Sequence, residues 1–301
     1  MARFGDTVVL QKLLQQSDIY LNEQDRYGYS AAMIAAIEGH IEVFKVLVFA
    51  GADLSLTNKK DEIAIFLSEA HGCKDVIERV LLEAVLANKL KEEEFKALHY
   101  AARRGNVEAL GQLLKRDCAV NALDEDGYTP LMLAAREGHA DACKILLLRG
   151  SDCCLVNHRG ETALALARRN NLSRVAEGVI LDHLAWNMVF AGEQLCKHTR
   201  QGKGAPHMKM VRMLKSGLLT WGKSSRRNVI CKEAGVGPSV TFCKNCYKGD
   251  ADKPAIFRIV TVKGREVHFE ARSATNVELW VRGINLIAKE MTTLNGNAVR
   301  K

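Results

Sequence analysis

A spacing of 33 residues, repeated along the first two thirds of the chain, most constrains the fold. Moving in steps of 33 from Gly138 gives Gly105, Gly72 and Gly39, and the same step from Gly127 gives Gly28, Asp61, Glu94 and Gly160. Glycine adopts positive φ without steric cost, so the spacing predicts turns that recur at a fixed interval. A period of this length is typical of solenoids, in which each unit buries its apolar face against its neighbours.

Residues 126–157 form the clearest unit and predict two short helices. Thr129 can cap a helix that Pro130 begins, because the φ of proline is preset for a first turn. Gly138 ends this helix, and a second one follows with apolar residues at helical spacing up to Gly150. Neither helix can bury its apolar face alone, so the unit requires neighbours.

The residues Gly-Tyr-Thr-Pro-Leu at 127–131 closely resemble the ankyrin-repeat family. Residues 160–167 (GETALALA) and 96–102 (KALHYAA) are similar at the same register. The resemblance implies an all-α solenoid. We expect a half repeat over 5–25, units starting near 28, 61, 94, 127 and 160, and a capping helix over 186–197, so that the solenoid covers residues 1–197.

Residues 198–209 predict a linker, because they contain Gly, Pro and basic residues without periodicity. The pattern then changes from helical to alternating. Residues 214–221, 229–231 and 240–242 predict strands, and 256–262 and 266–271 predict a hairpin joined by Lys-Gly-Arg. A helix with one apolar face follows over 274–288, in which Trp280 is expected to lie in the core.

Several strands followed by one amphipathic helix with a central Trp resemble a pleckstrin-homology domain. Residues 215–221 look like its first strand, 257–262 like a late strand and 274–288 like its closing helix. The resemblance implies an α+β β-barrel with a C-terminal helix over 210–291, followed by a tail over 292–301. The whole chain is therefore expected to be multidomain.

Charge divides the chain at about the same place. Residues 1–195 contain 22 Lys and Arg against 28 Asp and Glu, whereas residues 196–301 contain 21 against 7. The C-terminal part should be attracted to anionic surfaces such as lipid headgroups, nucleic acid or an acidic protein.

The pleckstrin resemblance implies that basic residues near the first strands grip headgroup phosphates, where clustered cations offer charge-assisted hydrogen bonds. The residues at matching positions are Lys215, Lys223, Arg226, Arg227 and Lys232. We therefore expect affinity for anionic membrane, with phosphoinositide as the specific form. Two alternatives remain open: this domain binds protein or RNA, or the chain is a regulatory fragment of a larger enzyme.

The ankyrin resemblance implies a concave face, built from turn tips and inner helices, that binds a protein partner. The residues expected on this face are Tyr29, Tyr100, Arg103, Asp124, Tyr128, Arg136 and Arg168. Tyr and Arg are enriched among residues that dominate interface energies. The chain is thus expected to be a non-enzymatic adaptor.

Catalytic and cofactor motifs are absent from the sequence, so no cofactor or small-molecule substrate is expected. Cys243 and Cys246 have metal-ligand spacing, but no second pair of ligands follows them. His40, His99 and His139 recur with the repeat, which favours hydrogen bonds in loops and between repeats over catalysis.

No apolar run is long enough to span a membrane. The nine scattered cysteines favour a reducing compartment, so a cytoplasmic protein is expected.

Overall fold

The computed structural model describes residues 1–16, 19–91, 95–116, 118–169, 174–199, 205–222, 228–245 and 255–298. The chain forms two compact units, residues 1–177 and residues 178–301. Among the described residues, no helix combines the length and the apolar character needed to span a membrane.

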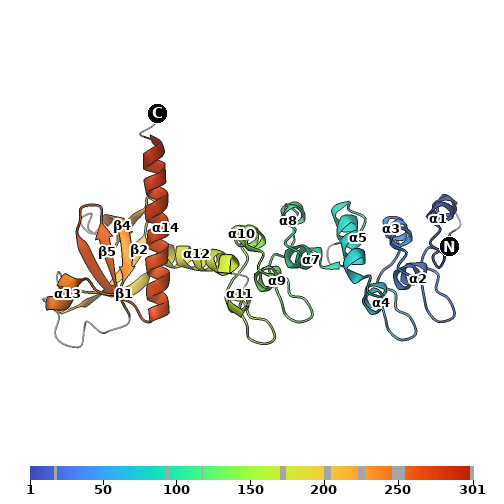
Figure 1. Ribbon diagram of the computed structural model, residues 1–301, viewed down its shortest axis with the longest axis horizontal. Coiled ribbons are helices and arrows are strands. Elements are labelled where there is room, and N and C mark those ends of the chain that lie inside the picture. The colour runs from blue at the N-terminus through green and yellow to red at the C-terminus, as the bar shows by residue number, and fades with distance from the viewer. Residues whose placement is uncertain are drawn as a thin grey trace. The chain divides into compact units, whose positions relative to one another are not determined.

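The first unit is a row of helix pairs at the positions that the 33-residue period predicts (Figure 1). A single helix, α1 (Thr7–Leu13), precedes them. The inner helices are α2 (Ala31–Ile37), α4 (Ala64–Ala70), α7 (Ala97–Arg103), α9 (Pro130–Glu137) and α11 (Ala163–Arg169). The outer helices are α3 (Ile41–Phe49), α5 (Lys74–Leu86), α8 (Val107–Leu113), α10 (Ala140–Leu148) and α12 (Arg174–Ala191). Only the first residues of α12 belong to the first unit, and the rest belong to the second.

The inner helices begin as the sequence predicts. The Thr129 hydroxyl accepts a hydrogen bond from the Met132 N–H at 3.2 Å, and Pro130 occupies the first helical position. Ser30 makes the same cap with Met33 at 3.3 Å. Gly138 ends α9 with φ of 84°, a conformation that glycine adopts without strain.

The turns between units are held by one recurring interaction. The side-chain oxygen of an Asp or Asn accepts hydrogen bonds from the backbone N–H groups two and four residues later. This occurs at Asp25, Asn58, Asp124 and Asn157. The position that completes the series, residue 91, is Lys, whose side chain has no acceptor.

Histidines connect neighbouring units. The Nε2 atom of His139 lies 3.0 Å from the carbonyl oxygen of Arg103, and the ring packs against Gly105, where a Cβ would lie 2.6 Å from it. The Nε2 atom of His40 is 3.1 Å from the carbonyl oxygen of Arg3. These contacts confirm the expected structural role of these histidines.

The second unit contains a closed six-stranded antiparallel barrel in which each strand pairs with the next and β6 pairs with β1. Its strands are β1 (Glu193–Lys197), β2 (His207–Met213), β3 (Leu218–Thr220), β4 (Asn228–Val236), β5 (Ile256–Thr261) and β6 (Glu266–Glu270). A short helix, α13 (Val240–Asn245), precedes β5, and a long helix, α14 (Ala274–Ala298), follows β6. The predicted hairpin over 256–271 is present.

Three expectations about this region are wrong. Residues 193–197 are not part of a capping helix but form β1, because α12 ends before Gly192, which has φ of 80°. Residues 207–209 are not linker but the start of β2. Residues 215–221 are therefore not the first strand, since β3 is the third.

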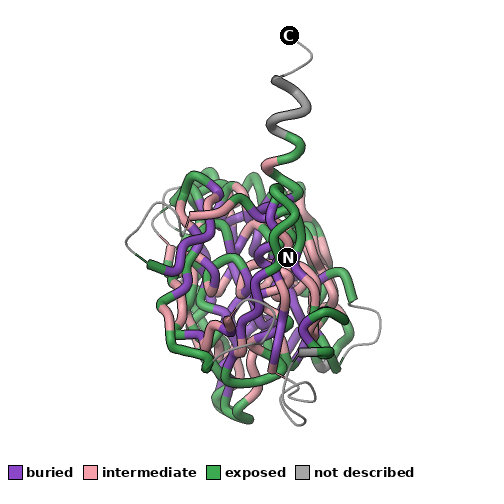
Figure 2. The backbone as a smooth tube through the Cα atoms, turned by 90° about the vertical axis from the view of Figure 1, so that its left-hand side faces the viewer, coloured by how far each residue is buried: buried purple, intermediate pink, exposed green. Residues whose placement is uncertain are grey.

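Two further boundaries differ from expectation. Val240–Phe242 belongs to helix α13 rather than to a strand, because it lies on the outside of the barrel with no strand partner among the described residues. The tail expected from residue 292 continues α14 as far as Ala298. Residues 289–293 of this helix are mostly exposed, and in Figure 2 this part of the helix extends away from the buried segments.

Trp280 is fully buried, as the sequence predicts. Its indole N–H donates a hydrogen bond to a Glu193 carboxylate oxygen at 3.0 Å, which ties α14 to β1. Helices α14 and α12 approach closely at Gly283, where a Cβ would lie only 2.7 Å from the carbonyl oxygen of Ala185. The barrel, α14 and the end of α12 therefore share one core.

Candidate protein-binding groove

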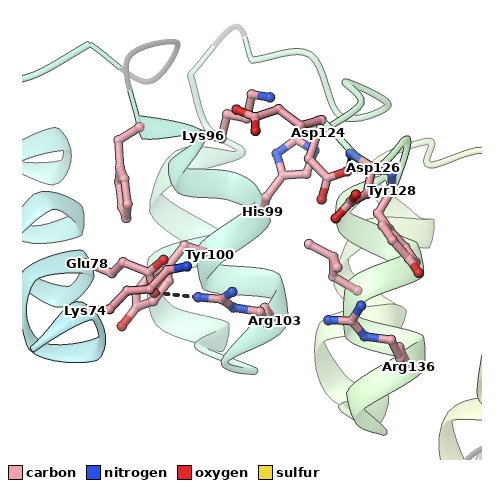
Figure 3. A pocket seen from close by; sticks show the side chains of 13 residues that line it. Lys74, Glu78, Lys96, His99, Tyr100, Arg103, Asp124, Asp126, Tyr128 and Arg136 are labelled. Carbon is pink, nitrogen blue, oxygen red and sulfur yellow. Dashed lines mark hydrogen bonds and ion pairs between the residues drawn. The ribbon is translucent and has the colours of Figure 1, made fainter. Parts of the chain in front are cut away.

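A groove of about 310 Å³ runs over the inner helix α7, with α5 on one side and the turn before α9 on the other (Figure 3). Five residues expected at a protein interface line it: Tyr100, Arg103, Asp124, Tyr128 and Arg136. Its other lining residues are Lys74, Glu78, Phe95, Lys96, His99, Glu125, Asp126 and Leu133.

A second depression of about 530 Å³ continues the groove toward α11. It shares Asp126, Tyr128 and Arg136 with the first. His158, Arg159, Leu166 and Arg169 complete its lining. The two depressions together form one polar surface with aromatic rings in its floor.

Ion pairs between α5 and α7 make one wall of the groove. Arg103 pairs with the buried carboxylate of Glu78, and Arg104 pairs with Asp75. Burial raises the pKa of Glu78, and the Arg103 guanidinium opposes this effect. The Tyr100 hydroxyl donates to the Asp75 carbonyl oxygen at 3.4 Å, and burial raises the pKa of Tyr100.

The opposite wall depends on the turn at Asp124. The Asp124 carboxylate accepts hydrogen bonds from the N–H groups of Asp126 at 3.1 Å and Tyr128 at 2.7 Å. Tyr128 is only 7% exposed, and the Arg136 guanidinium lies over its ring at 5.0 Å from the centroid. The turn therefore fixes the ring, and the ring orients Arg136 in the groove.

Two of the expected interface residues lie elsewhere. Tyr29 is half-buried in the first turn, where its N–H donates to Asp25. Arg168 lies on α11 and pairs with Glu177 at 2.8 Å. Neither residue lines the groove.

Sequence reasoning missed Glu78, Lys74 and Phe95 because they belong to, or adjoin, the degenerate third unit. One signal was available for Glu78. It interrupts the apolar run of α5 at a position that is buried, and a buried carboxylate requires a charged or hydrogen-bonding partner. Arg103, 25 residues later, provides it.

Two of the five basic residues expected to bind lipid lie in the described part of the chain. Lys215 is exposed in the turn before β3, whereas Trp221 and Gly222 follow the other end of this strand. Lys232 is exposed within β4. Lys223, Arg226 and Arg227 lie outside the described residues.

A depression of about 710 Å³ on the barrel exterior lies between α13 and the β5–β6 turn, and Lys263, Arg265 and His268 help to line it. The Nε2 atom of His268 accepts the Ser239 N–H at 3.1 Å, and Phe242 stacks on the ring. Burial lowers the pKa of His268 to about 4. The Nε2 lone pair already accepts the Ser239 N–H, so the His268 ring is poorly suited to act as a general base.

Asp152, Cys153 and Cys154 place three possible metal-ligating atoms within 4.8 Å of one another. The same turn recurs at Asp53 and Ser55, where a hydroxyl replaces the thiol and Asp53 accepts the equivalent N–H. Burial raises the pKa of Cys153 to about 11, which keeps the thiol protonated. The cluster is therefore a turn of the repeat.

Cys243 is exposed on α13, and Cys246 lies outside the described residues.

The profile of the family described as "Ankyrin repeats (3 copies)" matches residues 32–124, 62–157 and 98–183. These matches together span residues 32–183, just over half of the chain. The chain belongs to the ankyrin-repeat family. The groove is thus on the inner-helix side of an ankyrin stack.

Curated relatives match parts of this ankyrin-repeat chain. "Ankyrin repeat, SAM and basic leucine zipper domain-containing protein 1" of Saimiri boliviensis boliviensis is 32% identical over 110 residues, which cover 35% of this chain and 23% of that protein. "NAD-capped RNA hydrolase NUDT12" of Homo sapiens is 37% identical over 72 residues, which cover 24% of this chain and 16% of that protein. The chain thus spans less than a quarter of the length of these relatives.

Among solved structures, the ankyrin repeat protein EF0377 is 26% identical, with a TM-score of 0.41. The match covers 58% of this chain and 92% of that one.

Proposed function

We propose that this chain is a non-enzymatic adaptor whose ankyrin groove binds a segment of a protein partner. The observation that carries the proposal is the convergence of Tyr100, Arg103, Tyr128 and Arg136 on one groove. Tyr and Arg contribute most to interfaces when a rigid scaffold holds them. Here hydrogen bonds and ion pairs of the scaffold already fix their side chains.

A binding role is favoured over a catalytic one because the charged groups of the α5 wall are held in pairs. Arg103 and Arg104 neutralise Glu78 and Asp75. A general acid or base needs a proton that it can exchange with a substrate, and a paired, hydrogen-bonded carboxylate is poorly suited to this.

Quantitative affinity capture tests the proposal. The full chain is immobilised, and proteins retained from cell extract are measured by mass spectrometry for the natural chain, for Arg136→Glu and for Lys144→Glu. Lys144 is exposed on outer helix α10 and serves as the matched control. A partner should be lost with Arg136→Glu and kept with Lys144→Glu. Equal retention by both variants would refute the groove as the binding site.

A second candidate function concerns the barrel, which we propose is pleckstrin-homology-like and attaches to anionic membrane. In an antiparallel barrel of sequential strands, the β1–β2, β3–β4 and β5–β6 connections leave from the same end. Described cations at this end are Lys197, Lys263 and Arg265, and exposed Val262 lies beside them. Each cation near an anionic leaflet adds about 1 kcal/mol of attraction.

Vesicle flotation tests this candidate. Phosphatidylcholine vesicles with and without phosphatidylserine or phosphatidylinositol bisphosphate are mixed with the full chain at physiological salt. We expect Lys263→Glu with Arg265→Glu to weaken flotation, whereas Lys215→Glu, at the other end of the barrel, should have little effect. Equal loss in both variants would indicate non-specific charge attraction.

A single-stranded RNA probe in a parallel shift assay tests the nucleic-acid alternative.

A further inference from the structure

The row of inner helices is interrupted once. Helix α2 packs on α4, α7 on α9, and α9 on α11. Among the described residues, α4 and α7 are not a closely packed pair, and α7 packs instead on the outer helix α5. Figure 1 shows the wider separation between the α4–α5 pair and the α7–α8 pair. The interruption coincides with the position where Lys91 replaces the Asp or Asn of the other turns.

The outer row remains continuous at this point. Arg116 donates hydrogen bonds to the carbonyl oxygens of Val85 and Leu86, both at 2.8 Å. One period later, Arg149 makes the equivalent bond to Leu114 at 2.8 Å. These bonds satisfy the last carbonyl groups of α5 and α8. The stack is therefore held on its outer side and opened on its inner side.

Phe66 on α4 is left uncovered by this opening. It occupies the register position of Met33, His99 and Met132, which are 1%, 5% and 1% exposed, whereas Phe66 is 57% exposed. The equivalent His99 faces the next unit, since its Nε2 atom lies 2.9 Å from the Ala122 carbonyl oxygen. Phe66 thus lies at a register position that is buried at Met33, His99 and Met132 but is exposed on α4.

We propose that Phe66 is the docking point for a large apolar side chain of the partner. This inference rests on the proposed protein-binding function and specifies the chemistry of the partner. Charged groups next to the opening are already paired: Lys74 with Glu69 at 2.8 Å, and Arg103 and Arg104 with carboxylates of α5. A charged side chain would have to disrupt one of these pairs, whereas an apolar one covers Phe66 without doing so.

Charges on either side of the opening define the rest of the partner segment. The turn tip before α4 carries exposed Lys59 and Lys60, and the tip before α9 carries exposed Glu125 and Asp126. None of the four has an ion-pair partner among the described residues. The complementary segment therefore has an acidic residue, the apolar residue and a basic residue, in the order that follows the stack from α4 to α9.

The distance between these tips sets the length of the segment. Packed helices lie about 8–10 Å apart, and the step from α4 to α7 is wider than that, so the two steps from α4 to α9 cover at least about 20 Å. An extended chain rises about 3.3 Å per residue, and at least about six residues therefore separate the acidic from the basic position.

Peptide display tests the proposal. A phage library of random dodecapeptides is selected on the immobilised full chain. The enriched peptides are synthesised, and their affinities are measured by fluorescence anisotropy for four variants: Phe66→Ala, Leu148→Ala, Arg136→Glu, and Glu125→Lys combined with Asp126→Lys. Leu148 is an exposed residue of outer helix α10 and controls for the loss of a surface apolar group.

We expect the enriched peptides to share an acidic, an apolar and a basic position. Phe66→Ala should weaken binding about tenfold, as for other interface hot spots, and Leu148→Ala should leave it unchanged. Selection on the lysine variant should replace the basic position with an acidic one. Peptides that lose affinity with Arg136→Glu but not with Phe66→Ala would overturn this inference and leave the proposed groove intact. A selection that enriches no peptide would overturn both.

Discussion

Glu78 of α5 and Arg103 of α7 form an ion pair at the point where the inner helices separate. The Glu78 carboxylate is buried. Among the described residues, the pair is one of several side-chain links between the first two helix pairs and the next three. The pair therefore both defines one wall of the groove and holds the two parts of the stack together.

Glu78→Gln should leave stability at pH 7 within about 1 kcal/mol of the natural chain, because a neutral isostere keeps the hydrogen bond and removes the cost of a buried charge. The folded-state pKa of Glu78 is raised by burial. Between the unfolded and the folded pKa the native state binds more protons, so this group makes stability fall as pH rises through that window. Circular dichroism during urea unfolding, at pH values from 4 to 7, should show that the variant has lost this dependence. A steeper dependence in the variant would contradict the assignment.

Gly283→Ala should destabilise the barrel unit by about 1–3 kcal/mol, because the new Cβ would collide with the Ala185 carbonyl oxygen and the Val189 side chain. All three tryptophans, Trp186, Trp221 and Trp280, belong to this unit. Tryptophan fluorescence during denaturant unfolding therefore reports on it selectively.

Gly111→Ala is the matched control for this substitution. Gly111 lies inside α8, and a Cβ there would meet nothing within 4 Å. The substitution should raise stability by about 0.5–1 kcal/mol through better helix propensity. Equal effects of the two alanines would refute the close packing of α12 and α14.

Asn58→Ala should cost about 1–3 kcal/mol, since the N–H groups of Lys60 and Glu62 would lose the acceptor that holds their turn. Asn58 is 4% exposed, so water cannot easily replace its side chain. Asp25→Ala removes the same interaction from an exposed turn and should cost less. Thermal unfolding of the two variants measures the difference. A larger loss for Asp25→Ala would show that burial does not control the contribution of this turn.

Thiol reactivity should follow burial. Burial raises the pKa of both Cys143 and Cys231 to about 12, whereas Cys154 and Cys243 are exposed. At pH 8, iodoacetamide should label the two exposed residues first and the two buried ones only after denaturation, because the thiolate is the reactive form. Peptide mapping by mass spectrometry at successive times provides the measurement. Early labelling of Cys231 would show that the barrel opens readily.

The 33-residue period determined the position of each helix pair in the first unit, because glycine turns, Thr129 and Pro130 act through local backbone geometry. It also led to five of the groove residues, since register alone decides which residues of a repeat face inward. Register does not account for the exposure of Phe66, whose counterparts Met33, His99 and Met132 are buried. Whether such a position is covered depends on how α4 and α7 pack, and these helices belong to different units.

In the barrel unit, too, some features follow from local sequence and others only from tertiary contacts. Alternation predicted β5 and β6, and helical spacing placed Trp280 in the core. Residues 193–197 show no strong pattern of their own and become a strand because β2 and β6 pair with them on either side. The closure of the barrel, the pairing of Glu193 with Trp280 and the contact at Gly283 join residues far apart in the chain. Local sequence cannot specify such contacts, because they depend on the path of the whole backbone; only the tertiary structure decided them.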